Sequence, residues 1–359
     1  MRKILLNPGP VTTSETVKQA LVVEDICHRE KAFVSVLKSV RQKLLKLIDH
    51  SDLYAAVPFA SSGTGSVESM ITSLLPKDAT LAVLNNGAYG LRILNIARTY
   101  GIKTIEFSSP PDTAPDIQKL RSMLEQHPQV RYLAAVHHET STGFINPIEA
   151  LGGICKEKGI TFLVDAISSF GGVPFLPYAW GVDAFTGSPN KAIQGMPGCS
   201  FVICKKDLLL KSAGNARTFY FDLFAQFESL EKTGEMRFTP PVQVLYAFNQ
   251  ALDELLMEGL ENRILRFAQN ISVMREGLEA LGFKFFLKHP EKAALLLAIY
   301  FLGPDFDFDK VHDRLFQEGY TIYPGKAPTS QTFRVSVIGD LNQTDITSFL
   351  AALKNIIEG

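Results

Sequence analysis

The sequence has few cysteines, no long apolar run and no block of like charge. Its four cysteines, at positions 27, 155, 199 and 204, show no CxxC pair and no metal-ligand spacing, so we expect no metal site. The last two flank the apolar run SFVI, where reduced thiols act as small apolar residues. No stretch reaches the roughly 18 apolar residues of a membrane helix, and the N-terminus has too short an apolar run for a signal peptide. We therefore predict a cytoplasmic protein.

Charge is nearly balanced, with 36 Lys and Arg against 37 Asp and Glu and a net charge of -1. That balance argues against a nucleic-acid-binding protein that relies on a broad positive field, although it leaves room for a local basic pocket. The sequence also has no internal repeat and no low-complexity tract. Its 359 residues, 46% hydrophobic and 20% charged, are typical of a soluble globular protein with one large domain and a smaller one.

Strand and helix patterns alternate over about 200 residues, which predicts an α/β fold with a doubly wound, mainly parallel sheet. The first helical pattern covers 16–48, where apolar residues recur at spacings of three or four. After Arg237 the pattern changes to two long helices and then mixed elements, so we place a large domain at 1–258, with an N-terminal arm, and a smaller α+β domain at 259–359. The predicted strands are near-continuous apolar runs, as in sheets buried on both faces, and include 55–60, 79–85, 130–138 and 161–166.

Two polar features follow predicted strands, where ligands of open α/β sheets bind. In SSGTGSVES, backbone N–H groups and the hydroxyls of Thr64 and Ser66 predict an anion pocket at a helix start. Such turns are common by themselves, and no lysine follows the glycines, which excludes a Walker motif. Asp165 ends an apolar strand, where a buried carboxylate is costly without a partner. It either caps the next helical segment or faces a ring nitrogen.

Tyr89 and Lys191 complete the set. Tyr89, in NNGAYG, is either ordinary packing or a flat surface for a ring. Lys191 stands alone among small residues in GSPNKAIQGMPG, where by itself it could be a solvated or snorkelling lysine. Together, a phosphate cradle, a stacking aromatic, a carboxylate for a pyridine nitrogen and a loop amine are the parts of a pyridoxal phosphate site. The amine of Lys191 would form the Schiff base with the cofactor aldehyde.

Matching pieces over nearly the whole chain carry a resemblance: LLNPGPVTTSETVK, NNGAYGLR, HHETSTGFINPI, VDAISSFGGVPF, NKAIQGMPG, DLFAQFESLEKTGEMRFTPP and YPGK with FRVSVIGD. The chain resembles the class-V branch of the fold-type I pyridoxal-phosphate-dependent aminotransferases. The specific pieces are NKAIQGMPG, RFTPP and DLFAQ, whereas NPGP and TSTG indicate only the wider branch. The resemblance implies a large, doubly wound domain, a smaller C-terminal α+β domain and a homodimer.

The resemblance also implies a role for each matching residue. Lys191 would be the Schiff-base lysine and Asp165 the partner of the pyridinium nitrogen, both catalytic. Arg334, in FRVSVIGD, would bind the acidic group of the substrate. The other cofactor-binding residues would be Thr64, Gly65 and Ser66 at the phosphate, Tyr89 against the ring, Thr140 near the phenolic oxygen, Asn190 beside the lysine, and Thr239 reaching the cofactor phosphate of the neighbouring subunit.

Within the branch the chain is most similar to transaminases that use 2-aminoethylphosphonate and pyruvate, which implies formation of phosphonoacetaldehyde and alanine in phosphonate catabolism. Two places depart from that pattern: EDICHREKAF at 24–33, and Met236, where an aromatic is common. A transaminase of the alanine–glyoxylate or phosphoserine type shares the cofactor residues and stays an alternative.

Two further alternatives are weaker. A cysteine desulfurase needs a catalytic thiol before the substrate arginine, and residues 319–337 hold no cysteine. A catalytically silent protein of this fold is disfavoured because Lys191 and Asp165 are both present.

Overall fold

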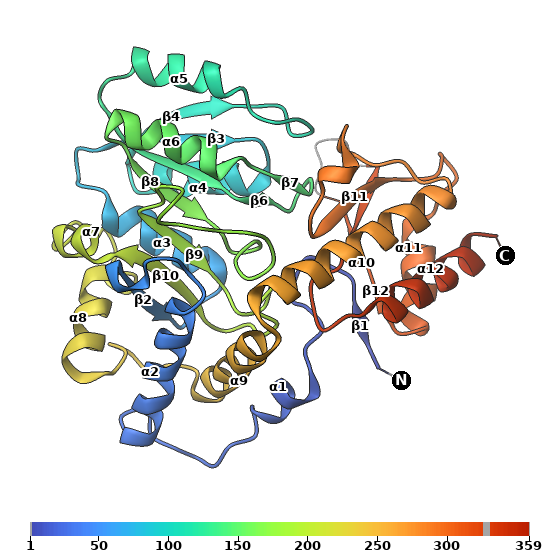
Figure 1. The fold of residues 1–359 in the computed structure, drawn as a ribbon, viewed down its shortest axis with the longest axis horizontal. Coiled ribbons are helices and arrows are strands. Elements are labelled where there is room, and N and C mark those ends of the chain that lie inside the picture. The colour runs from blue at the N-terminus through green and yellow to red at the C-terminus, as the bar shows by residue number, and fades with distance from the viewer. Residues whose placement is uncertain (1, 326–330, 359) are drawn as a thin grey trace.

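The computed structural model describes residues 2–325 and 331–358. Its larger part is an α/β unit with helices on both faces of a central sheet, and a smaller α+β part lies beside it (Figure 1). Within the described residues the central sheet has seven strands in the order β2-β10-β9-β8-β5-β3-β4. In chain order these are β2 (Tyr54–Phe59), β3 (Thr80–Asn85), β4 (Lys103–Ser108), β5 (Val130–Val136), β8 (Thr161–Asp165), β9 (Ala184–Gly187) and β10 (Ser200–Lys205).

Strand direction decides where a site can form. β10 is antiparallel to both of its neighbours, β2 and β9, whereas the other adjacent strands are parallel. Because two reversals restore the original direction, β2 runs the same way as β9, and the carboxyl ends of these strands meet at one edge of the sheet. The predicted α/β class and the mainly parallel sheet are confirmed.

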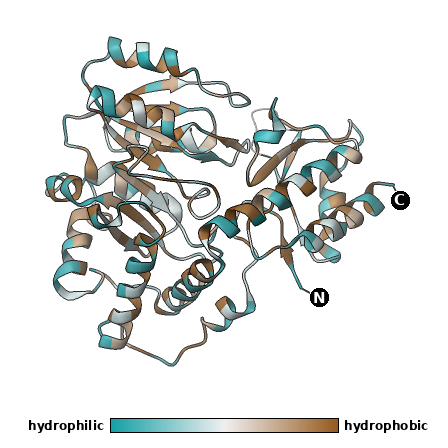
Figure 2. Ribbon diagram, in the orientation of Figure 1, coloured by the Kyte–Doolittle hydropathy of each residue, from teal (hydrophilic) through white to brown (hydrophobic). Residues whose placement is uncertain are grey.

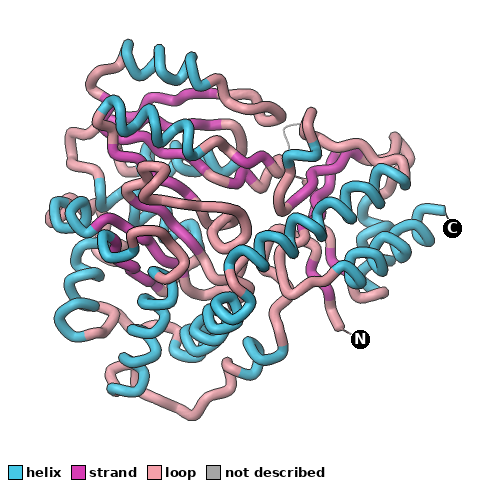
Figure 3. The backbone as a smooth tube through the Cα atoms, in the orientation of Figure 1, coloured by secondary structure: helices cyan, strands magenta, loops and turns pink. Residues whose placement is uncertain are grey.

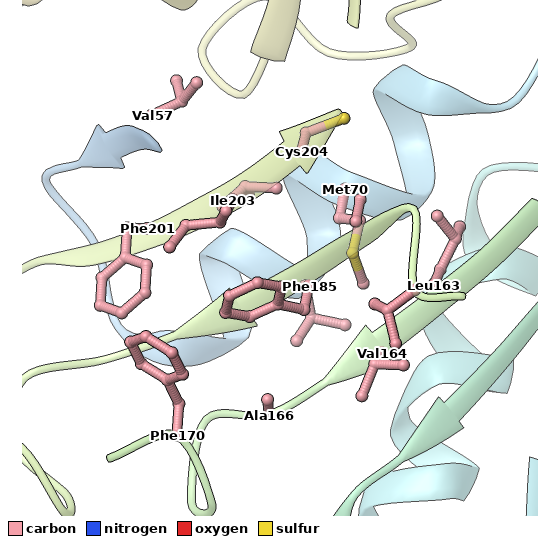
Figure 4. Close-up of a cluster of buried hydrophobic side chains, with 14 of the residues drawn as sticks. Val57, Met70, Leu163, Val164, Ala166, Phe170, Phe185, Phe201, Ile203 and Cys204 are labelled. Atoms are coloured by element: carbon pink, nitrogen blue, oxygen red, sulfur yellow. The ribbon is translucent and has the colours of Figure 1, made fainter. Parts of the chain in front are cut away.

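Aromatic side chains pack together around β9 and β10 (Figure 4). The ring of Phe170 lies 5.1 Å from that of Phe185 and 5.9 Å from that of Phe201, centroid to centroid. All three are buried, and burying one such side chain contributes about 1.5–3 kcal/mol. Phe185 and Phe201 belong to hydrophobic runs of the sequence that form β9 and β10.

The helix predicted over 16–48 is wrong in its middle part. The structure has a short α1 (Glu15–Gln19), then irregular chain over residues 20–30, and then α2 (Lys31–Leu45). Figure 3 shows the irregular segment as a long loop at the bottom of the molecule. Only α2 buries a regular apolar face, because the stretch with Glu24, Asp25 and His28 offers no continuous apolar stripe to a core.

Helices of the larger part cover the sheet and carry hydrophilic positions on their outward sides (Figure 2), whereas α3 is buried along most of its length. A small hairpin of β6 (His138–Glu139) and β7 (Phe144–Ile145) follows β5. Across the described residues we find no helix with the length and apolar character needed to cross a bilayer. The helices are α3 (Gly63–Leu74), α4 (Ala88–Thr99), α5 (Ile117–Gln126), α6 (Ile148–Lys158), α7 (Lys206–Lys211), α8 (Leu223–Thr233) and α9 (Val242–Glu258).

The smaller part has a hydrophobic cluster of its own, to which the start of the chain contributes Ile4 and Leu6. Its three-stranded sheet has the order β11-β14-β13, and a separate β1 (Ile4–Leu5) pairs in parallel with β12 (Tyr320–Thr321). The division near residue 258 stays a prediction. The elements are α10 (Leu260–Ala280), β11 (Leu296–Tyr300), α11 (Phe308–Gln317), β13 (Tyr323–Pro324), β14 (Thr332–Ser336) and α12 (Gln343–Glu358).

Candidate active site

A cavity of about 140 Å³ lies at the edge of the central sheet where β2, β3, β5, β8 and β9 end. Five of the residues singled out from the sequence line it, although the first and the last of them are 127 positions apart in the chain. These five are Thr64, Tyr89, Asp165, Asn190 and Lys191. The wall also contains Gly63, Val67, Arg92, Val136, His138, Ile167, Ser168 and Ser188.

The predicted phosphate turn is the first turn of α3. Thr64 lines the cavity, whereas the buried Ser66 hydroxyl donates a hydrogen bond to the Gly63 carbonyl at 2.8 Å and does not line it. A Cβ on Gly65 would lie 2.7 Å from the Cβ of Ser61, so close packing requires glycine there. The unpaired N–H groups that begin a helix favour an anion. The turn therefore offers backbone donors and the Thr64 hydroxyl to the cavity, and the role of Ser66 at the phosphate stays a prediction.

Lys191 lies four residues beyond the end of β9 at Gly187, on a loop anchored to other segments. The carbonyl of Ala192 accepts a hydrogen bond from Nη1 of the buried Arg263 at 2.9 Å, and Gln194 adopts a left-handed conformation with φ of 66°. The Nζ atom of Lys191 itself donates to the carbonyl of Pro8, from the N-terminal arm. These contacts explain how a lone amine on a tight loop keeps a defined position.

Asp165 ends β8 and is only 6% exposed. Its Oδ1 accepts a hydrogen bond from the Ile167 backbone at 3.0 Å, and the residues that follow form turns, so it caps no helix. The pKa of Asp165 is raised to about 6, chiefly by burial and in part by the nearby Glu139, while the Ile167 hydrogen bond, Arg92 and Lys191 oppose the shift. A protonated ring nitrogen would give this buried carboxylate a cationic partner.

Tyr89 is positioned by a residue that our sequence analysis did not single out. Glu139 is fully buried, and its Oε2 accepts hydrogen bonds from the backbone N–H groups of Tyr89 at 3.1 Å and Gly90 at 3.2 Å. The carboxylate therefore lies at the N-terminus of α4, where the helix dipole favours a negative charge. A Cβ on Gly87 would overlap the side chain of Glu139, which explains the glycine before this helix. The hydrogen bonds to Glu139 thus fix the backbone position from which the Tyr89 side chain extends.

Arg92 is a second cavity residue that the sequence analysis did not assign. It stands three positions after Tyr89 on α4, so both side chains project from one face of the helix. Its guanidinium carbon lies 4.6 Å from the centre of the Tyr89 ring, and its Nη1 donates to the hydroxyl of Thr64 at 3.0 Å. The signal was present in NNGAYGLR, but the helical spacing alone did not reveal a partner 28 residues away.

Two buried polar side chains follow β5. Burial lowers the pKa of His138 to about 3, so the imidazole that lines the cavity is neutral. Thr140 does not line the cavity, but its Oγ1 is buried without a hydrogen-bond partner in the described structure. Such groups usually gain a partner from a ligand or water. The predicted position of Thr140 near a cofactor oxygen stays a prediction.

Arg334 lies in β14 of the smaller part and reaches the cavity indirectly. It is only 2% exposed, and it donates from Nη1 to the Thr140 carbonyl at 3.1 Å and from Nε to the Pro324 carbonyl at 3.2 Å. Burial lowers the pKa of Arg334, and a hydrogen bond with Tyr89 opposes this shift. Arg334 therefore contacts the cavity residue Tyr89 without lining the cavity itself.

Three features singled out from the sequence lie away from this cavity. Thr239 is exposed, and Met236 is buried among the apolar residues of the larger part. In the 24–33 segment, the side chain of Arg29 is 70% exposed and lies 3.9 Å from Glu235. Within the described part of the chain, these residues contribute nothing to the cavity wall. Lys326, which ends YPGK, lies outside the described residues.

The residues at the cavity fit pyridoxal phosphate. A Cβ on Gly63 would lie 2.8 Å from Ile167, so the start of α3 packs closely against the loop after Asp165. Helix N–H groups suit the phosphate, the amine of Lys191 suits the aldehyde, and the raised pKa of Asp165 suits a cationic ring. Elsewhere in the described ranges, no group of three or more His, Cys, Asp or Glu side chains is placed to hold a metal ion.

Solved structures share this fold. Alanine–glyoxylate aminotransferase from Nostoc sp. superposes with a TM-score of 0.90 at 26% identity, covering 99% of this chain and 96% of that one. Pyridoxamine–pyruvate aminotransferase from Mesorhizobium loti superposes with a TM-score of 0.91 at 24% identity, covering 100% and 93%. The fold is therefore that of the fold-type I pyridoxal-phosphate-dependent aminotransferases.

Sequence comparison identifies the family of aminotransferases to which the chain belongs. The family model for class-V aminotransferases matches residues 13–346. The chain is 37% identical to 2-aminoethylphosphonate–pyruvate transaminase of Lysinibacillus sphaericus over 353 residues, covering 98% of this chain and 96% of the relative. The Salmonella typhimurium enzyme of the same name is 36% identical over 354 residues, with the same coverage. The chain belongs to the class-V aminotransferase family, and it is a pyridoxal-phosphate-dependent transaminase.

Proposed function

We propose that the protein transfers the amino group of 2-aminoethylphosphonate to pyruvate, forming phosphonoacetaldehyde and alanine, as a step in phosphonate catabolism. The observation that carries this proposal is the relation, along 98% of the chain, to two transaminases that bear this name. The cytoplasmic location predicted from the sequence stays part of the proposal.

The cavity residues divide the chemistry between them. When bound, pyridoxal phosphate supplies an electron sink for the charge that develops when the donor carbon loses its proton. Asp165 would hold a proton on the ring nitrogen, because its buried carboxylate would gain a cationic partner there. Lys191 would hold the cofactor aldehyde through Nζ, and the same atom would carry the proton to or from the donor carbon. Tyr89 orients the ring from the start of α4.

Arg334 is proposed to bind the anionic end of both substrates. The donor carries its phosphonate two carbons from the amine and has no carboxylate, so its recognition needs one strong anion site away from Lys191. A planar guanidinium can pair bidentately with phosphonate or with the carboxylate of pyruvate. The hydrogen bonds to the carbonyls of Thr140 and Pro324 hold Arg334 next to Tyr89, on the small-domain side of the cavity.

The donor assignment predicts that 2-aminoethylphosphonate gives a higher kcat/KM than alanine or phosphoserine, with pyruvate or glyoxylate as acceptor. Steady-state kinetics with the purified enzyme provide the comparison. Arg334→Lys should lower kcat/KM for both half-reactions, by about 10-fold or more, because a lysine keeps the charge but not the two-pronged geometry. Arg275→Lys, which changes an arginine of α10 paired with Glu279, is the matched control and should change neither half-reaction.

An amino acid that exceeds 2-aminoethylphosphonate by tenfold would overturn the donor assignment and favour the alanine–glyoxylate or phosphoserine type. The family assignment rests on sequence similarity, and the covalent role of Lys191 is tested by borohydride reduction. Neither depends on this comparison of amino donors.

We also propose that the working unit is a homodimer in which Thr239 reaches the cofactor phosphate of the neighbouring subunit. Thr239 is exposed and lies outside the cavity of its own chain. Beside it, the Phe238 ring stacks on Tyr220 at 5.3 Å, and Phe219 is 78% exposed. Arg237 lies over Phe219 and Phe238, with its guanidinium carbon 5.3 Å and 5.0 Å from the two ring centres. Exposed aromatic and Arg side chains are characteristic of contact surfaces.

Light scattering should therefore give twice the chain mass, and Phe219→Glu should shift the protein towards monomer and weaken cofactor binding. Met257→Glu changes a residue that is 87% exposed outside this aromatic group, so it serves as the control and should stay dimeric. A wild-type monomer with full activity would remove Thr239 from the site.

A further inference from the structure

We propose that Arg92 binds the phosphate group of the cofactor and supplies the side-chain cation of that subsite. The assignment rests on the family's cofactor and not on the choice of amino donor. It adds a residue that was not assigned from the sequence. The phosphate turn of α3 itself contains no basic side chain, so a side-chain cation for the phosphate has to come from another element.

The position of Arg92 is set by two contacts that meet at the phosphate turn. Its Nη1 donates to Oγ1 of Thr64 at 3.0 Å, and Thr64 occupies the first turn of α3. Its guanidinium carbon lies 4.6 Å from the centre of the Tyr89 ring, which holds the planar group against α4. Both partners line the cavity with Arg92. An anion bound at the start of α3 would therefore lie within reach of the guanidinium.

The charges around the cavity require such a cation. A phosphate monoester carries close to two negative charges at neutral pH, and a helix N-terminus offsets only about half a charge. Of the cavity-lining side chains, His138 is neutral because burial lowers its pKa to about 3, and the amine of Lys191 is committed to the aldehyde. Arg92 is the remaining basic side chain in the described cavity wall.

The contacts that Arg92 makes also favour the binding of an anion by its guanidinium group. Across residues 2–325 and 331–358, no carboxylate lies within ion-pair distance of Arg92, although it is partly buried. Its hydrogen bond goes to the neutral hydroxyl of Thr64. The neighbouring Arg98 on the same helix differs, because it pairs with Glu106 at 3.0 Å. A guanidinium fork has five donors, so the Thr64 contact leaves others for phosphate oxygens.

The test compares two forms of the cofactor on cofactor-free protein. Wild type and Arg92→Gln are titrated with pyridoxal 5'-phosphate and with pyridoxal, which lacks the phosphate, and binding is followed by absorbance and fluorescence without any amino donor. We expect the variant to bind pyridoxal 5'-phosphate about 10- to 100-fold more weakly, since hydrogen bonds to charged groups are lost. Its affinity for pyridoxal should stay within about twofold of wild type.

Two further variants make the result decisive. Arg92→Lys keeps the charge and should recover part of the phosphate-dependent affinity, and it replaces the glutamine variant if that protein does not fold by circular dichroism. Arg98→Gln, on the same helix, should bind both forms like wild type. If Arg92→Gln weakens both forms equally, Arg92 only supports Tyr89 and the proposal is wrong. Unchanged binding of both forms would also overturn it, whatever the enzyme's donor proves to be.

Discussion

Replacing Lys191 with alanine is expected to lower turnover by at least about 10³-fold while leaving the protein folded. The side chain has two tasks in the proposed mechanism, the covalent link to the cofactor aldehyde and proton transfer at the donor carbon, and a positioned acid–base group alone contributes about 10²–10⁴-fold. The backbone around it is anchored through Ala192 and Gln194, so truncating the side chain should not release the loop. Single-turnover absorbance measurements with the amino donor would report the loss.

Borohydride reduction gives a second measurement on the same variant. In wild type it should attach the cofactor irreversibly to the peptide that holds Lys191, as mass spectrometry of a digest would show. Lys191→Ala should show no attachment, and Lys211→Ala, which changes an exposed lysine on α7, should behave like wild type. Attachment to any other lysine in wild type would mean that the assignment of Lys191 is wrong.

Asp165→Asn is expected to keep the cofactor but to lose about 10²–10³-fold in turnover, a size typical of removing one positioned electrostatic group. Asparagine preserves the shape and can still accept the hydrogen bond from Ile167, but it carries no charge to hold a proton on the ring nitrogen. The expected signature is a fall in kcat with little change in the dissociation constant of the cofactor. Turnover near that of wild type would show that the carboxylate is not needed at the ring.

The same variant should change the stability of the cofactor-free protein with pH. Burial raises the folded-state pKa of Asp165 to about 6 from its usual 3.8, so the folded protein binds this proton more tightly than the unfolded chain. The favourable contribution is complete below pH 3.8 and is lost as the pH rises through 6. Cofactor-free Asp165→Asn should thus be more stable than wild type at pH 8, by up to about 3 kcal/mol.

Urea unfolding at pH 4 and pH 8 would measure that difference, which should nearly vanish at the lower pH. Bound cofactor should reverse the order at pH 8, because a cationic ring nitrogen restores a partner to the carboxylate of wild type only. Equal stability of the two cofactor-free proteins at pH 8 would contradict the raised pKa of Asp165.

Local patterns in the sequence were enough for the α/β class, the mainly parallel sheet and the residues at strand ends. Continuous apolar runs mark strands buried on both faces, and Asp165 could be placed at the end of one because a polar residue interrupts such a run. The strand-to-helix turn before α3 was recognisable from its small residues. Since carboxyl ends of parallel strands meet, these positions already implied one shared cavity.

Only the tertiary structure decided which side chains complete that cavity. The pairing of Arg92 with Thr64 and the contact of Glu139 with Tyr89 join residues 28 and 50 positions apart. The contact of Lys191 with the Pro8 carbonyl likewise joins residues 183 positions apart. The break at residues 20–30, inside what the sequence pattern predicts as one helix, was also visible only in the structure. Helical and strand periodicities report which face of an element is apolar, but they carry no information about what that face meets. The partners were determined by how separate segments pack around the sheet.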